Sequence, residues 1–379
     1  MLESIIKAFT SLKLTVICLG LAIILVFMGT IAQVDLGIHA AQQKYFQTFF
    51  VYWSPANRGW RIPVFPGGHL IGGVLFLNLI AAHIYRFQMK WKKTGIFLLH
   101  LGIFLLLLGG LLTEWLSTES QMRIHEGETK NYSESLDAIE LIIVDTSSPD
   151  LDEVVSIPDR FLVPHQVIQH PQLPFRLNVV NFFPNSTLGH RKDESEPSVV
   201  TQGFGKTLSV TEAPRATKVN EADVPTIIVE IVGVEGSLGT WLCSTALMER
   251  QHFYYQDKSY EIQLRQKRYY KPYSIKLLHF AHDQYDGTDI PKNFSSKIHL
   301  VNSEKKEDRE VLIYMNNPLR YEGETYYQAG FEKDNHTTVL QVVHNPSWIT
   351  PYLACSMVGL GLVIQFSMHL FNFGRKKRA

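Results

Sequence analysis

Four long runs of apolar residues interrupt a sequence that is otherwise mixed, at residues 14–32, 69–85, 95–113 and 348–373. None of these runs contains Asp, Glu, Lys or Arg. A helix needs roughly 20 apolar residues to cross the hydrocarbon core of a bilayer, and all four runs are near that length. The pattern therefore predicts four transmembrane helices.

The stretch between the third and fourth runs has a different period. Short alternating or β-branched segments recur along it, separated by turn groups such as those at 285–287 and 321–323; the segments are IELIIV, FRLNVVNFF, TIIVEIVGV, YEIQLRQKRYY, YSIKLLHF, KIHLV and TVLQVV. This pattern is typical of strands, and the stretch is long enough for a core of its own. We expect a sandwich or two stacked sheets, with a long polar loop or insertion at 185–223 and a helix at 237–249.

The sequence thus predicts a membrane protein with four transmembrane α-helices and a large, mainly antiparallel β domain inserted between helices 3 and 4. Its expected parts are an N-terminal membrane region at 1–115 with helices at about 14–32, 69–86 and 95–113, an extracytoplasmic β domain at 116–346, and a last helix with a basic tail at 347–379.

Lys and Arg gather beside the ends of the apolar runs, near the N-terminus, in the connector 86–93 and in the tail 375–378. Short loops rich in these residues stay on the cytoplasmic side. We therefore expect both termini in the cytoplasm and the β domain outside, periplasmic or extracytoplasmic, on a plasma or inner membrane. The first run is longer than the apolar region of a signal peptide, roughly 7 to 15 residues, so we expect an uncleaved anchor.

Aromatic residues are frequent at residues 45–53, after the first run. Phe46, Phe49, Phe50 and Trp53 recur at helical spacing opposite polar residues. This spacing fits a helix that lies in the membrane interface or an aromatic belt at the end of a spanning helix. The proline-containing residues 57–68 are predicted to be turn and loop.

Two histidines, His83 and His100, lie inside the second and third runs. At about 1.5 Å per residue, both are within roughly 9 Å of the cytoplasmic ends of their helices and so at comparable depth. A histidine in hydrocarbon usually faces a protein interior or a cofactor, and two neutral imidazoles at one depth can ligate haem iron axially. Alternatively, each one only hydrogen-bonds a neighbouring helix. His369 lies at similar depth, but the adjacent basic tail favours an interfacial role.

Small residues are frequent in the second and third runs, among them Gly72, Gly73, Gly102, Gly109 and Gly110. Small side chains let helix backbones approach closely in lipid. We therefore expect the second and third helices to pack tightly against each other.

Composition excludes several functions. The net charge is zero and no nucleic-acid-binding motif is present, so the sequence gives no support to nucleic-acid binding. Cys18, Cys243 and Cys355 form no CxxC pair and no CxxCH site, which excludes dithiol exchange and covalent c-type haem. His279 and His282 are three residues apart, but on a strand they need not face together, so a metal site there is not favoured.

The order of these elements resembles the ResB family of cytochrome c biogenesis proteins, also called CcsB. The resemblance extends over nearly the whole chain and rests on five stretches: SLKLTVICLGLAIILVFMGTIAQVD, FLNLIAAHIYRF and HLGIFLLLLGG in the first three runs, and GTDIPKNFSSKIHLVN and MNNPLRYEGETYYQAGFEK in the β domain. The last two are the most specific, because outer domains of unrelated membrane proteins have no reason to share them.

The resemblance implies a System II subunit that binds haem b without a covalent bond, beside a ResC/CcsA-type membrane protein with a tryptophan-rich WWD motif. This chain has no Trp-Trp pair and so resembles the unfused ResB-type subunit. In the family, a histidine from each protein binds haem in the membrane, and haem then moves outward to the CxxCH of apocytochrome c. His83 best matches that axial ligand through the haem iron, and His100 is the second choice.

The expected partners are thus the ResC/CcsA-type protein, apocytochrome c and membrane lipid, and the chain is expected to be a non-autonomous subunit of a haem lyase without a catalytic residue of its own. Two other classes stay open. One is a b-type electron-transfer subunit in which His83 and His100 ligate one haem. The other is a scaffold that binds apocytochrome and has purely structural histidines.

Overall fold

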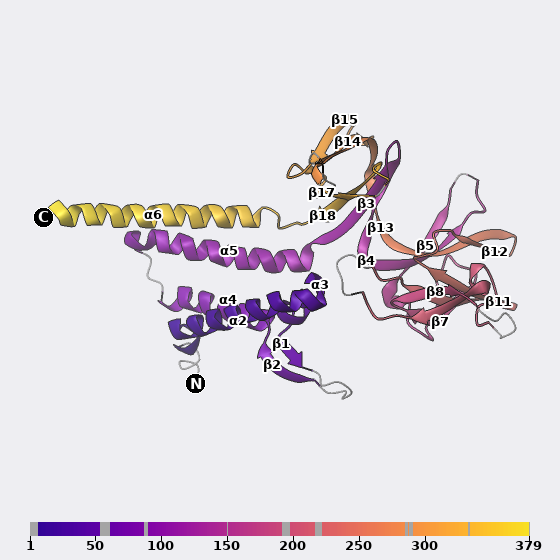
Figure 1. The fold of residues 1–379 in the computed structure, drawn as a ribbon, viewed down its shortest axis with the longest axis horizontal. Coiled ribbons are helices and arrows are strands. Elements are labelled where there is room, and N and C mark those ends of the chain that lie inside the picture. The colour runs from indigo at the N-terminus through magenta and orange to yellow at the C-terminus, as the bar shows by residue number, and fades with distance from the viewer. Residues whose placement is uncertain are drawn as a thin grey trace. The chain divides into compact units, whose positions relative to one another are not determined.

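The computed structural model describes residues 7–53, 61–86, 90–149, 151–191, 198–216, 222–284, 287, 291–332 and 334–378. They form two compact units (Figure 1). The helical unit contains the described residues before Thr118 and after His344. The β unit contains Thr118–Ala216 and Ala222–His344.

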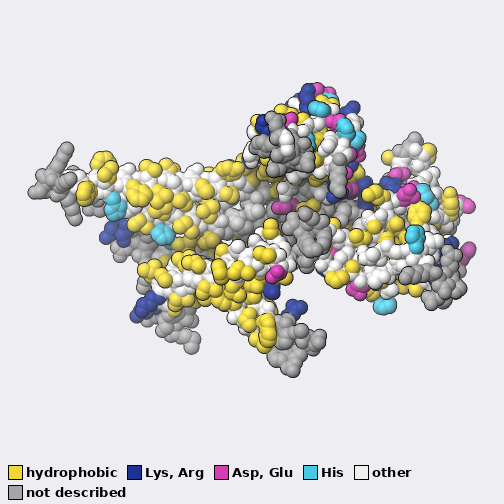
Figure 2. Space-filling model, in the orientation of Figure 1, with side chains coloured by type: hydrophobic (Ala, Val, Ile, Leu, Met, Phe, Trp, Pro, Cys, Tyr) yellow, Lys and Arg dark blue, Asp and Glu magenta, His cyan; other side chains and the backbone are white. Residues whose placement is uncertain are grey.

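Within its described residues, the helical unit contains four helices that are long and apolar enough to cross a membrane, so the four predicted helices are present. They are α2 (Leu12–Leu36), α4 (Gly68–Arg86), α5 (Thr94–Leu116) and α6 (Thr350–Arg378), with the 3₁₀ turn η2 (Trp91–Lys93) before α5. Hydrophobic side chains cover much of the visible surface of these helices, whereas most visible charged side chains lie over the β unit (Figure 2).

The aromatic segment between α2 and α4 does not form the helix that its spacing predicted. α3 (Ile38–Ala41) and the π turn η1 (Gln42–Phe46) are followed by strand β1 (Phe50–Trp53), which pairs antiparallel with β2 (Ile62–Pro66) inside the predicted loop. Aromatic and β-branched residues suit a paired strand, and the pairing buries Val51. Residues 57–60 lie outside the described part of the chain.

Three glycines let α5 and α6 approach closely. Gly95, Gly102 and Gly109 recur every seven residues, about two turns, and so share one face of α5. An added Cβ atom at Gly95 would lie 2.8 Å from the carbonyl oxygen of Gly361. At Gly102 it would lie 2.6 Å from Val358 Cγ2, and at Gly109 it would lie 2.8 Å from Thr350 Cγ2. We call this contact the α5–α6 seam.

This packing corrects the prediction that the glycines join the second and third helices. The glycines of α5 that lie against a neighbour lie against α6, and a Cβ atom at Gly72, Gly73 or Gly110 would meet nothing within 4 Å. The prediction failed because a glycine count shows that a close approach is possible but does not name the partner helix.

α2 packs against α4 through an apolar cluster and one polar side chain. The cluster includes Cys18 and Leu25 of α2 and Ile71 of α4. Asn78 is 4% exposed; its Oδ1 accepts a hydrogen bond from Thr15 Oγ1 at 2.7 Å, and its Nδ2 donates to the carbonyl oxygen of Phe9 at 2.6 Å. A satisfied polar group inside an apolar unit fixes the start of α2 against α4.

The β unit is antiparallel in every described strand pair, as predicted. Its strands are β3 (Thr118–His125), β4 (Thr129–Asp145), β5 (Glu153–Pro158), β6 (Val167–Ile168), β7 (Arg176–Phe183), β8 (Ser186–His190), β9 (Leu208–Glu212), β10 (Thr226–Gly233), β11 (Gly236–Ser244), β12 (Gln251–Tyr255), β13 (Lys258–Gln284), β14 (Pro291–Asn302), β15 (Glu307–Tyr314), β16 (Leu319–Tyr321), β17 (Glu324–Phe331) and β18 (Thr337–His344), with 3₁₀ turns η3 (Asp159–Phe161) and η4 (Phe204–Thr207).

The β unit has two separate cores: the long strand β13 contributes side chains to both, and β4 contributes to the first. In the first core, the sheet β11-β10-β7-β6 packs on β5, β12 and the adjoining parts of β4 and β13. The second core is enclosed by β3, the far part of β13 and β14 to β18. Between the two, the β4–β13 register is interrupted from Tyr270 to Ile275.

Two local predictions in the β unit need correction. The expected helix at 237–249 is mainly strand β11, whose residues Trp241, Leu242 and Cys243 are all buried. A strand covered on both faces has a continuous apolar run, which resembles a buried helix in sequence. The expected loop at 185–223 contains the paired strands β8 and β9.

Candidate functional site

His83 lies in the last turn of α4. Its Nδ1 is 3.0 Å from the carbonyl oxygen of Leu79, four residues earlier on the same helix. A carbonyl oxygen only accepts hydrogen bonds, so the proton is assigned to Nδ1. In that tautomer, Nε2 has the lone pair with which a neutral imidazole ligates a metal.

His100 lies on α5 and has the same local arrangement. Its Nδ1 is 2.7 Å from the carbonyl oxygen of Ile96. The His83 and His100 rings are 5.0 Å apart between centroids and tilted by 57°, and Phe97 lies on the same side of α5, 6.4 Å from the His83 ring. The structure therefore brings together the two histidines that the sequence singled out.

Side-chain contacts continue along α4 and α5 away from the two histidines. His69, Phe76 and His83 recur every seven residues and share one face of α4. The contacts to α5 are His69 Nε2 to Glu114 Oε1 at 3.2 Å, Phe76 stacked on Phe104 at 5.0 Å and 15°, and His83 on His100. We call this line of contacts the α4–α5 seam.

His369 lies apart from this seam. It is on α6, where its Nε2 is 2.8 Å from Nε2 of Gln365. Gln365 packs on the glycine face of α5, because a Cβ atom at Gly95 would lie 2.9 Å from its backbone nitrogen. His100 is five residues after Gly95 and so points from a different face of α5.

The β unit holds a histidine group that sequence reasoning missed. Glu126, just after β3, lies 3.0 Å from Nδ1 of His279 and 3.1 Å from Nδ1 of His336. The backbone N–H of Phe280, together with the two imidazoles, holds the pKa of the Glu126 carboxyl below its ordinary value. These residues are far apart in the sequence, so spacing gave no signal.

His279 and His282 do not face together. His279 contacts Glu126 at the surface, whereas the ring of His282 packs on Phe331 with centroids 4.2 Å apart. Within the described part of the chain, no group of three or more His, Cys, Asp and Glu residues is arranged to hold a metal ion.

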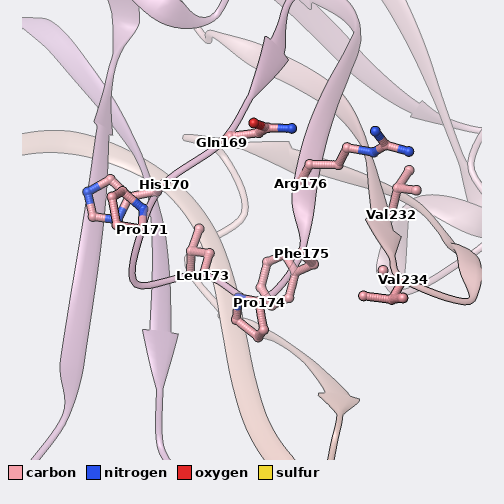
Figure 3. A pocket seen from close by; sticks show the side chains of 10 residues that line it. Gln169, His170, Pro171, Leu173, Pro174, Phe175, Arg176, Val232 and Val234 are labelled. Atoms are coloured by element: carbon pink, nitrogen blue, oxygen red, sulfur yellow. The ribbon is translucent and has the colours of Figure 1, made fainter.

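A groove of about 660 Å³ lies on the β unit, between the segment before β7 and the end of β10 (Figure 3). Phe175 is 5% exposed in its floor, and His170, Arg176 and Val234 also line it. None of the histidines singled out by the sequence lines this groove.

Comparison with known proteins finds two likenesses. The model of the ResB-like family matches residues 227–340. Protein NrfI of Wolinella succinogenes is 25% identical over 308 residues, which cover 77% of this chain and 29% of NrfI. Both matches support the assignment of the chain to the ResB-like family. The chain spans less than a third of the length of NrfI.

The match to the ResB-like family lies in the β unit, from β10 to β18, and does not include the helical unit. Within it, Glu324 accepts hydrogen bonds from Tyr273 and Tyr326, both at 2.8 Å, and pairs with Lys271. Burial raises the pKa of both tyrosine hydroxyls. Since Tyr326 is fully buried, the family stretch MNNPLRYEGETYYQAGFEK supplies a buried polar group that ties β17 to β13.

Proposed function

We propose that this chain is a haem-handling subunit of a cytochrome c synthase complex, and that His83 supplies an axial nitrogen to haem iron within the membrane. The observation that supports this best is the 3.0 Å contact between Nδ1 of His83 and the Leu79 carbonyl oxygen. Metal-ligating histidines usually donate their other N–H to a carbonyl or carboxylate, which fixes the tautomer and orients the ring. The neighbouring rings of Phe97 and His100 form an aromatic wall suited to a porphyrin.

The cargo in this proposal is haem b, held without a covalent bond and then attached to the CxxCH of apocytochrome c. A ResC/CcsA-type partner with a WWD motif provides the outer haem site and most of the bond-forming chemistry. The chain's own residues hold the cargo: a neutral imidazole coordinates iron and releases it again without breaking a covalent bond. The β unit presents a polar surface that can meet a protein substrate.

The proposed topology has both termini in the cytoplasm and the β unit outside a plasma or inner membrane. The excess of Lys and Arg beside the expected inner ends supports it. A reporter that is active only outside, fused at Arg191, is expected to give a signal, and the same reporter at Gln88 is expected to be silent. The reverse result would refute the topology.

The haem assignment is tested with His83→Ala in the full chain co-expressed with its partner. Alanine has no nitrogen to offer, so haem per complex and cytochrome c maturation should both fall sharply, while the amount of inserted protein stays near wild type. Added imidazole should restore part of the haem spectrum by entering the vacated position. His369→Ala is the matched control, because it removes a helix histidine outside the α4–α5 seam.

A second candidate is a b-type electron-transfer subunit in which His83 and His100 ligate one iron permanently. The observation in its favour is that both histidines have Nδ1 within hydrogen-bond distance of a helix carbonyl oxygen, which leaves the Nε2 lone pair of each ring for a metal. This reading expects a stable Soret band in the chain purified without a partner, and equal haem loss in His83→Ala and His100→Ala. The scaffold reading expects no haem band with or without the partner.

A further inference from the structure

We propose that His100 is a positioning residue, which holds the His83 imidazole in place for haem iron by ring contact and does not itself ligate the iron. The proposal rests on the haem-binding role proposed for His83. It concerns α5, which lies across the α4–α5 seam from His83 and outside the residues matched by the ResB-like family model.

The helix that presents His100 is firmly held. Gly95 and Gly102 lie directly against α6: added Cβ atoms would lie 2.8 Å from the carbonyl oxygens of Gly361 and Ala354 respectively. Backbone contact at this distance leaves α5 little freedom to move relative to α6. The orientation of the His100 ring is also fixed, because its Nδ1 is hydrogen-bonded to the Ile96 carbonyl oxygen. His100 therefore presents a fixed surface.

The helix that presents His83 has a looser contact with α5. Gly72 and Gly73 of α4 have open space beside them, and aromatic rings rather than backbone meet across the seam. The hydrogen bond to Leu79 fixes the tautomer of His83, and the His100 ring limits how far the imidazole can swing. An aromatic pair of this kind is worth about 0.5 to 1.5 kcal/mol beyond its buried area.

The observed ring geometry argues against joint ligation of one iron. With metal–nitrogen bonds of about 2 Å, two imidazoles on opposite sides of an iron have ring centres about 6 Å apart, with the porphyrin plane between them. The His83 and His100 centroids are 5.0 Å apart, and the rings are tilted into direct contact. A porphyrin inserted between the two rings would push α4 away from α5. If the helices stay in place, His83 ligates the iron and His100 remains beside the His83 ring, on the same side of the porphyrin.

The test compares His100→Phe with His100→Ala in the full chain co-expressed with its partner. Phenylalanine keeps an aromatic ring on α5 but has no nitrogen. We expect His100→Phe to keep haem per complex, the Soret position and the rate of haem transfer to apomyoglobin near wild type. We expect His100→Ala to retain haem at first but to release it roughly 2- to 10-fold faster, with a high-spin contribution to the spectrum from a poorly held ligand.

Each alternative result has a definite meaning. If His100→Phe loses haem as completely as His83→Ala, His100 is a ligand and the proposal is wrong. If His100→Ala matches wild type in release rate and spectrum, His100 has no positioning role and the proposal is equally wrong. If His83→Ala leaves the haem spectrum unchanged, the proposed function fails first, which this set of variants distinguishes from a failure at His100. Should His100→Ala fail to insert, the result with His100→Phe still decides between ring and nitrogen.

Discussion

The α5–α6 and α4–α5 seams involve the same helix but are built differently. In the α5–α6 seam, glycines bring backbone against backbone, with no space for one added carbon at Gly102. In the α4–α5 seam, rings meet rings, as at Phe76 and Phe104. A seam filled by backbone has no room for a ligand, whereas rings can turn aside for a flat molecule. The difference favours the α4–α5 seam over the α5–α6 seam as the place where the proposed haem would bind.

The largest expected effect on stability comes from disrupting the α5–α6 seam. Gly102→Ala places a Cβ 2.6 Å from Val358 Cγ2 and 2.8 Å from the Ala354 carbonyl oxygen. Overpacking of this kind typically costs about 1 to 3 kcal/mol, and we expect a corresponding fall in the unfolding midpoint in detergent. Gly110→Ala is the matched control on the same helix, since its Cβ would meet nothing within 4 Å. Equal effects of the two changes would show that the seam is not close-packed.

Sequence alone predicted the four helices and the antiparallel β unit, because long apolar runs and alternating segments have strong periods. It did not predict which helix the glycines of α5 meet, since partner choice is a tertiary property. It predicted a helix where β11 lies, because Trp241, Leu242 and Cys243 are consecutive apolar residues in either case. Local periodicity reports burial reliably but does not report which neighbour causes it.

The candidate site shows the same division. The comparable depth of His83 and His100 followed from helix rise, and the structure places their rings in contact. The hydrogen bond from Nδ1 of each histidine to a helix carbonyl oxygen could not be predicted, because it depends on the side-chain rotamer. The group around Glu126 was also missed, because its members come from β13 and from the ends of β3 and β18, which only the folded sheet brings together.

The second prediction measures the ring contact in the middle of the α4–α5 seam. A double-mutant cycle of Phe76→Ala and Phe104→Ala should give a coupling energy of about 0.5 to 1.5 kcal/mol, typical of an aromatic pair. The measurement is the unfolding midpoint in detergent of the two single variants and the double variant. A coupling energy of zero would mean that the rings do not hold this seam.

The third prediction uses the histidines of the β unit, which are bound to a carboxylate rather than to a helix carbonyl. The Phe280 N–H and the imidazoles lower the pKa of Glu126 in the folded protein. A lowered pKa adds stability above the unfolded value, about 4.3, and this stability is lost as the pH falls through the folded pKa. Glu126→Gln should therefore cost about 1 kcal/mol near neutral pH and less below about pH 4.

The measurement for Glu126 is the unfolding midpoint of the full chain as a function of pH. Asp334 provides an internal reference, because the hydroxyl of Thr337 and neighbouring backbone N–H groups lower the pKa of its carboxyl to about 2. Asp334→Asn should thus keep its effect to lower pH than Glu126→Gln. If Glu126→Gln lowers the stability by the same amount at every pH, the stabilisation does not come from the ionised Glu126 carboxylate, and this prediction is wrong.

The smallest expected effects concern the seam ends far from His83. The α4–α5 seam has the half-exposed pair His69 and Glu114, 3.2 Å apart, whereas the α5–α6 seam has neutral hydrogen bonds between the side chains of Thr113, Ser347 and Asn345. At a pH low enough to protonate His69, the pair of His69 and Glu114 is ionic. Exposed ionic pairs contribute about 0 to 1 kcal/mol and are screened by salt, so under that condition Glu114→Gln should change the unfolding midpoint slightly, and less in high salt. Thr113→Val should cost about 1 kcal/mol at any salt concentration, because neutral hydrogen bonds are not screened. A large, salt-independent effect of Glu114→Gln would mean that this end of the α4–α5 seam is held as firmly as the α5–α6 seam. The two seams would then not differ in how tightly they are closed.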